Sequence, residues 1–66
     1  MIEKAYKIKY GDKWVEIIRM LGNYDYKLHD NIEDVKLMTL NQAMAAKGLL
    51  SGDFKLNIDK IEVIKC

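Results

Sequence analysis

Two short glycine turns, each between stretches of alternating residues, constrain this chain more than any other feature of its sequence. Residues 2–10 alternate between apolar and polar side chains, which is the pattern of a strand with one buried face. Gly11-Asp12 follows, and glycine in the first position of a two-residue turn is typical of a type II′ hairpin. A second two-residue turn is predicted at Gly22-Asn23. The two turns predict an antiparallel meander of three strands.

The same turns predict how the strands pair. The first turn sets Tyr10 opposite Lys13, Ile8 opposite Val15 and Tyr6 opposite Ile17. The second turn sets Leu21 opposite Tyr24, Arg19 opposite Tyr26 and Ile17 opposite Leu28. Both registers place eight residues on one face of the sheet: Tyr6, Ile8, Val15, Ile17, Leu21, Tyr24, Tyr26 and Leu28. We expect a helix to pack on this face.

A short helix is predicted over residues 40–47. Thr39 and Gln42 have the spacing of a capping box, in which each side chain bonds the backbone N–H of the other residue. The helix includes three alanines and no proline or β-branched residue. Lys47 and Gly48 then predict its end, because glycine readily adopts the left-handed conformation that follows many helices. The helix should therefore be about eight residues long, or two turns.

The segments on either side of this helix leave two choices open. Residues 29–34 are polar and predict a loop, and residues 35–38 are either a short fourth strand or an extended approach to the helix cap. Phe54, Leu56 and Ile58 alternate as in a strand, but the apolar positions shift by one residue at Ile61. Either a bulge or a turn therefore lies at Asp59-Lys60, and the absence of glycine favours a bulge.

Together these elements predict an α+β fold. It comprises a three-stranded antiparallel β-meander, one short α-helix packed on one face, and a long C-terminal β-strand that joins the sheet beside the first strand. We expect residues 1–66 to form a single small domain, with a stability of about 3–5 kcal/mol if it is monomeric.

The composition of the chain indicates where in the cell the protein is expected. The sequence contains no apolar run long enough for a transmembrane helix and no apolar signal core, so we expect a soluble protein without membrane contact. Cys66 is the only cysteine, which fits the reducing environment of the cytoplasm. The excess of lysine, isoleucine and asparagine is consistent with an AT-rich bacterial or phage genome.

No combination of residues predicts catalysis. His29-Asp30 is the only adjacent histidine and carboxylate, and the possible nucleophiles are a turn serine, a helix-cap threonine and the last residue: Ser51, Thr39 and Cys66. The acidic residues near His29 match no known calcium or zinc spacing and predict a solvated loop. We therefore expect neither an enzyme nor a cofactor, metal or small-molecule site.

The face of the meander opposite the helix offers a candidate interface. Trp14, Ile18 and Met20 lie there among charged residues, which resembles the apolar centre and polar rim of a small protein interface. Alternatively, Ile61, Val63 and the C-terminal segment cover this face. The function that we expect is non-catalytic protein binding, through this face or an exposed edge strand, with formation of a homodimer as its simplest form.

Nucleic-acid binding is the alternative. Five basic residues lie in or next to the first hairpin, near aromatic side chains that could stack on bases: Lys4, Lys7, Lys9, Lys13 and Arg19. A net charge of +1 gives only a weak positive field, and ten of the eleven basic residues are lysine rather than arginine. We therefore rank this function below protein binding.

Overall fold

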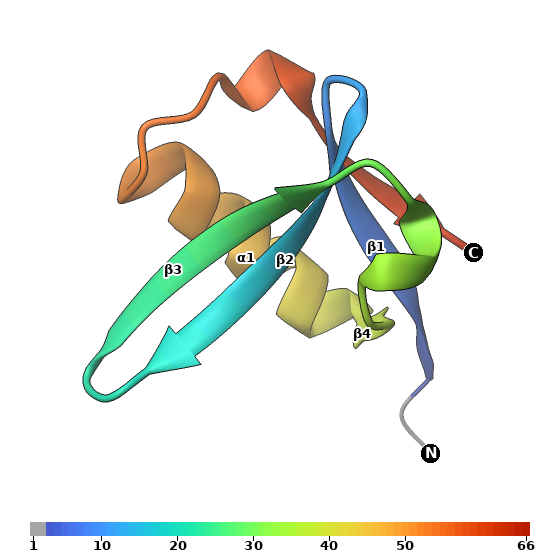
Figure 1. The fold of residues 1–66 in the computed structure, drawn as a ribbon, viewed down its shortest axis with the longest axis horizontal. Coiled ribbons are helices and arrows are strands. Elements are labelled where there is room, and N and C mark those ends of the chain that lie inside the picture. The colour runs from blue at the N-terminus through green and yellow to red at the C-terminus, as the bar shows by residue number, and fades with distance from the viewer. Residues whose placement is uncertain (1–2) are drawn as a thin grey trace.

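The computed structural model describes residues 3–66 and has the expected α+β architecture (Figure 1). Its strands are β1 (Lys4–Tyr10), β2 (Lys13–Met20), β3 (Asn23–His29), β4 (Met38–Thr39) and β5 (Ile61–Lys65). Its helices are α1 (Leu40–Gly52) and the short 3₁₀ helices η1 (Ile32–Asp34) and η2 (Ile58–Lys60). The strands form one antiparallel sheet in the order β3-β2-β1-β4, and β5 also pairs with β1. The predicted start of the first strand at Ile2 lies outside the described residues.

The first hairpin is confirmed, but it is shorter than predicted. Ile8 pairs with Val15 and Tyr10 with Lys13, and Gly11 has a φ of 61° in the turn. The predicted pairing of Tyr6 with Ile17 is wrong, because β1 and β2 separate beyond Ile8. Tyr6 pairs instead with Met38 of β4 and with Lys65 of β5.

The second turn lies one residue earlier than predicted, at Leu21 and Gly22. Met20 pairs with Asn23, and the observed pairs further along are Arg19 with Tyr24, Ile17 with Tyr26 and Val15 with Leu28. The predicted register of β2 against β3 is therefore wrong by two residues. A shift of two keeps every side chain on its predicted face, because side chains alternate with a period of two. Leu21 is the exception, since it leaves the strand for the turn.

Helix α1 begins as predicted but ends later. Both hydrogen bonds of the capping box form, from the Gln42 N–H to the Thr39 hydroxyl oxygen at 3.1 Å and from the Thr39 N–H to the Gln42 side-chain oxygen at 3.0 Å. The predicted end at Gly48 is wrong, because the helix is 13 residues long and ends at Gly52. The extra turn buries Leu50 completely. Burying leucine gains about 1.5–3 kcal/mol, which exceeds the cost of about 1 kcal/mol for a helical glycine.

The C-terminal strand joins β1 as predicted, with Ile61 opposite Tyr10, but it is short. Residues 54–57 are not a strand, although Phe54 and Leu56 pack against the core. The 3₁₀ helix η2 occupies the position of the predicted bulge, and the Asn57 side chain caps it by accepting from the Asp59 N–H at 3.0 Å. Neither predicted alternative is observed: the favoured bulge at Asp59-Lys60 does not form, and a 3₁₀ helix that follows a non-strand segment is not a two-residue hairpin turn. Phe54 and Leu56 pack against the core without pairing in the sheet, whereas Ile58, the third apolar residue of the predicted strand, is 54% exposed.

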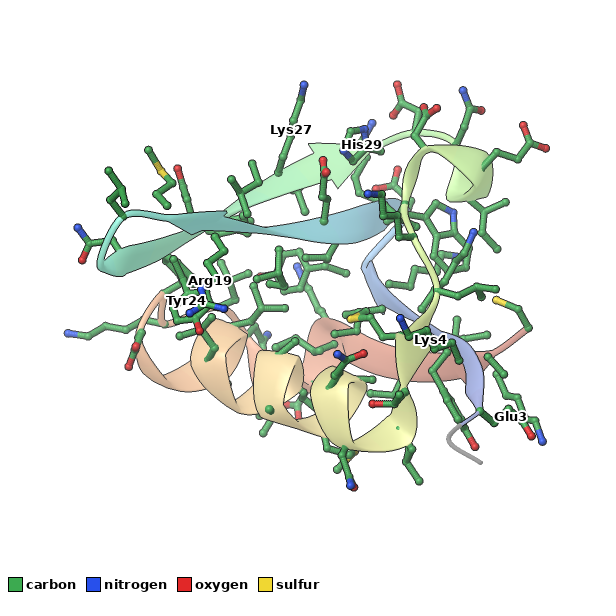
Figure 2. The ribbon with its side chains drawn as sticks, turned by 90° about the horizontal axis from the view of Figure 1, so that it is seen from below. Glu3, Lys4, Arg19, Tyr24, Lys27 and His29 are labelled. Carbon is green, nitrogen blue, oxygen red and sulfur yellow. The ribbon has the colours of Figure 1, made fainter. Side chains whose placement is uncertain are left out.

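The core lies between the sheet and α1, on the face that the sequence predicts. Its buried residues come from three strands and the helix: Ile8, Val15, Ala43, Ala46, Leu50 and Ile61. Figure 2 shows α1 on one side of the sheet and the side chains of Lys27 and His29 on the other. None of the helices in residues 3–66 is both long and apolar enough to cross a membrane.

Candidate functional site

The predicted interface residues Trp14, Ile18 and Met20 share the face of β2 that points away from α1. Trp14 and Ile18 are half-buried, whereas Met20, next to the second turn, is 56% exposed. The ammonium group of Lys9 lies 5.5 Å from the centre of a Trp14 ring, a distance that permits a cation–π contact. Of the three, Met20 is therefore the residue most available to a partner.

The C-terminal segment does not cross this face. Ile61 is a core residue, and Val63 packs against the core from the side of α1. The segment after β3 approaches the face instead, because the Lys7 ammonium group donates to the Ile32 carbonyl of η1 at 2.7 Å. Val35, which follows η1, is only 4% exposed. The loop between β3 and β4 thus contacts the part of this face that lies on β1.

The five basic residues of the alternative site do not gather on one surface. Strand alternation places Lys7 and Lys9 on the face away from α1, and Lys13 and Arg19 on the other, whereas Lys4 lies where the pairing of β1 with β4 shifts register. Lys7 and Lys9 make the two contacts just described, with Ile32 and Trp14. Lys13 forms an ion pair with Asp30, which raises the pKa of Lys13 and lowers the pKa of Asp30. The hydrogen bond between the two groups is the main cause of both shifts.

The candidate catalytic residues are also separated. His29 Nε2 lies 2.8 Å from Glu16 Oε1, so the carboxylate that contacts it is not that of Asp30. Ser51 donates to the Lys47 carbonyl within α1, Thr39 caps the helix, and Cys66 is exposed at the end of β5. In residues 3–66 no three histidine, cysteine or acidic side chains cluster as metal ligands would.

A groove lies between the β2–β3 hairpin and α1, and we call it the arm groove. Its volume is about 500 Å³, and eight residues line it: Ile17, Arg19, Tyr24, Met38, Gln42, Ala45, Ala46 and Leu49. Figure 2 shows the side chains of Arg19 and Tyr24 between the end of the hairpin and the helix. The hairpin, β4 and α1 therefore form three sides of one groove.

The arm groove exists because two strands compete for one edge of β1. Tyr6 pairs with β4 and with β5 at once, so these two strands lie on opposite edges of β1. Ile8 likewise pairs with β2 and with β5. β2 and β4 therefore share one edge, and β2 must leave it where β4 begins. Figure 1 shows β2 diverging from β1 and β4, with α1 behind the space between them.

The chemistry of the arm groove is mostly apolar with one positive charge. Arg19 is its only charged residue, and Gln42 and the Tyr24 hydroxyl are its other polar groups. Arg19 is exposed and takes part in none of the ion pairs found among residues 3–66. The part of α1 that lines the groove carries alanine, leucine and glutamine, so a ligand could approach the helix closely. The groove therefore suits an apolar group that is accompanied by a negative charge.

Of the residues that line the arm groove, only Arg19 is a predicted site residue, as part of the alternative nucleic-acid site. Two predictions that the structure contradicts conceal the groove: a helix that ends before Leu49, and a pairing of β1 with β2 as far as Ile17. One signal was present, because α1 has a single charged residue, Lys47, and an exposed helix face without charge is unusual. Comparisons of the chain with protein-family models, with curated proteins and with solved structures find no match.

Proposed function

We propose that this chain is a non-catalytic protein-binding module, with the arm groove as its principal contact site. The observation that carries the proposal is an open groove of about 500 Å³ whose lining is apolar except for Arg19, Tyr24 and Gln42. Such a lining matches protein interfaces, in which aromatic residues and arginine supply much of the binding energy. Tyr24 is 51% exposed, so its ring is free to contact a partner.

The exposed end of the opposite face could extend this contact. Met20 lies next to the turn of the same hairpin, and Ile18 and Trp14 follow it along β2. The partner is either another protein or a second copy of this chain. The single cysteine and the lysine-rich composition fit a cytoplasmic protein of bacterial or phage origin, and that assignment is part of the proposal.

Capture of partners from a bacterial lysate, with and without nuclease treatment and with two matched helix variants, tests the proposal. Ala45→Glu places a carboxylate in the arm groove beside Arg19, whereas Asn41→Glu adds the same charge to an exposed helix position outside it. We expect the wild-type protein and Asn41→Glu to retain the same protein partner, and Ala45→Glu to lose it. Far-ultraviolet circular dichroism would verify that both variants remain folded.

Two outcomes would contradict the proposal. If the captured material is nucleic acid that nuclease removes, the basic residues of the first hairpin become the binding site. If a protein is retained by Ala45→Glu but lost by Met20→Glu, the contact site is the face with Trp14, Ile18 and Met20 rather than the arm groove. Met20 serves this purpose because it is exposed, so its substitution leaves the core intact.

A further inference from the structure

We propose that the arm groove binds an extended segment of a partner protein, which adds to the free edge of β2 as a strand and places a carboxylate against Arg19. This inference rests on the proposed function and names the chemistry of the partner. It combines three observations: the unpaired edge of β2, the position of Arg19 on that edge, and the absence of negative charge from the groove lining.

The backbone of β2 has unused hydrogen-bonding groups on the groove side. In a two-residue hairpin the residues that flank the turn form a hydrogen-bonded pair. Non-hydrogen-bonded and hydrogen-bonded pairs then alternate along the two strands. Counting from either turn gives the same result: Ile17 and Arg19 direct their N–H and C=O groups away from β3. On that side the pairing with β1 ends at Val15. An added strand would find four free backbone groups.

The outer edge of β3 is less suited to pairing. The Tyr26 N–H, which points to that edge, already donates to the Asp25 carboxylate at 2.8 Å. Asp25 and Lys27 are exposed there, and charged residues commonly protect edge strands from pairing with other chains. No comparable contact is present at Ile17 or Arg19 among residues 3–66. The groove side of β2 is therefore the better acceptor of a strand.

The side chains on this edge specify a short pattern in the partner. Ile17 and Arg19 are two residues apart and both face α1, and residues directly opposite on an added strand would lie about 4.5–5.5 Å from them. An apolar residue fits opposite Ile17, above Ala46 and Leu49 of the groove lining. A carboxylate fits opposite Arg19, since no acidic residue of the groove competes for the guanidinium group. The partner segment should carry an apolar and an acidic residue two positions apart.

A second copy of this chain does not supply that pattern from β3. The neighbours of Asp25 on its face of β3 are Asn23 and Lys27, neither of which is apolar. Tyr24, Tyr26 and Leu28 form the other face, which has no acidic residue.

On β5, the other edge strand, Glu62 and Ile64 do have the required spacing, but Lys9 lies directly opposite Glu62 and places a cation beside that carboxylate. The occupant that we infer is therefore a different protein, and a dimer of this chain that Glu62→Lys abolishes would overturn that choice.

Synthetic peptides test the inference directly. The probe is a blocked heptapeptide with the sequence threonine, leucine, threonine, aspartate, threonine, leucine, threonine, which reads the same in both directions and so fits a parallel or an antiparallel strand. One control has lysine in place of aspartate. The other carries N-methyl groups on the backbone amides of aspartate and of the two threonines beside it, so amides on both edges of an added strand are blocked. Fluorescence polarisation measures the dissociation constants.

We expect the aspartate peptide to bind at least about tenfold more tightly than either control. Arg19→Glu should reverse the charge preference in favour of the lysine peptide, and Arg19→Lys should retain the original preference. On binding of the aspartate peptide, exchange of the Ile17 and Arg19 amide hydrogens should slow. Arg19 is exposed, so these variants should keep the fold.

Two results would overturn the inference. Equal binding of the N-methylated peptide would exclude strand addition, and absence of binding by the aspartate peptide at millimolar concentration would exclude the proposed pattern. Neither result would remove the proposed function if Ala45→Glu still abolished capture of a protein from the lysate. If the aspartate peptide fails to bind and Ala45→Glu also still captures the protein from the lysate, the proposed function is contradicted as well.

Discussion

At the scale of single residues, the Lys13–Asp30 ion pair joins β2 to the loop after β3 and should be visible in titration. The ammonium group lowers the pKa of the Asp30 carboxyl group below its ordinary value of 3.8. The pair therefore contributes to stability above that value, and the contribution is lost as the pH falls through the lowered pKa of the folded protein. At high pH the contribution of the pair to stability is lost as the pH rises through the raised pKa of Lys13.

The first prediction concerns this titration. Carbon-detected NMR should give Asp30 a midpoint below 3.8 at low salt, and Lys13→Met should return it toward the ordinary value. High salt should reduce the shift, because both side chains are accessible to solvent. A midpoint in the wild-type protein equal to that of Lys13→Met would show that the pair does not form in solution.

The second prediction concerns Gly22, which has a φ of 74° in the turn between β2 and β3. This backbone conformation costs other residues about 1–2 kcal/mol, so Gly22→Ala should lower the free energy of unfolding by about that amount. Gly22→Asn should cost less, because asparagine tolerates positive φ better. Urea titration followed by circular dichroism measures both changes. Equal effects of alanine and asparagine would argue against a left-handed residue at this position.

At the scale of elements, Gly48 distinguishes the predicted helix from the observed one. In the predicted helix Gly48 follows the last turn, where alanine would be strained. In the structure it lies inside α1, and an added Cβ atom would meet no atom within 4 Å. Gly48→Ala should therefore destabilise the protein if the helix ends as predicted, and stabilise it if the helix continues as observed.

The third prediction is that Gly48→Ala raises the free energy of unfolding by about 0.5–1 kcal/mol. The cause is the smaller conformational entropy that alanine loses on entering a helix. Urea titration with Gly22→Ala as the matched control should give changes of opposite sign. A destabilised Gly48→Ala variant would indicate that the helix ends where the sequence alone suggests.

How much of each element could be predicted depended on how local its cause is. The Thr39 cap and the first turn were predicted because their hydrogen bonds lie within a few residues. The end of α1 could not be predicted, because the burial of Leu50 against other elements outweighs the preference of Gly48. Residues 54–57 were assigned to a strand because their alternation is the same whether the apolar side chains pack beneath a sheet or lie within one.

At the scale of the whole molecule, the small core leaves little reserve of stability. Six buried residues form its central cluster, and a domain of this size gains about 3–5 kcal/mol from a single core. Leu50 and Ile8 are both fully buried, one from the helix and one from the central strand. Removal of either side chain should therefore affect the entire domain.

The fourth prediction is that Leu50→Ala abolishes cooperative folding at 25 °C. The substitution should cost about 2–5 kcal/mol, which is comparable to the total stability. Leu21→Ala is the matched control, because Leu21 is fully exposed in the turn and its loss should change stability little. Near-ultraviolet circular dichroism and thermal melting follow both variants. A cooperative transition in Leu50→Ala would mean that a partner or an oligomer supplies additional stability.

The arm groove also belongs to this scale, which explains why the sequence did not reveal it. Its shape depends on which strand takes each position along one edge of β1. The alternation of residues 4–10 is the same whether β2 or β4 is the neighbour of Tyr6. Only the complete set of pairs, including the far C-terminal β5, determines where β2 must diverge.

The central place of β1 also affects the order of folding during synthesis. β1 is translated before β5, yet one of its edges is filled only by β5, whose Ile61 completes the core. The β2–β3 hairpin can form as soon as it leaves the ribosome, because its contacts are local. The sheet, by contrast, must wait for residues 61–65. Until they emerge, the nascent chain exposes its central strand on that edge, and this is the interval in which a chaperone or a neighbouring chain could bind to it.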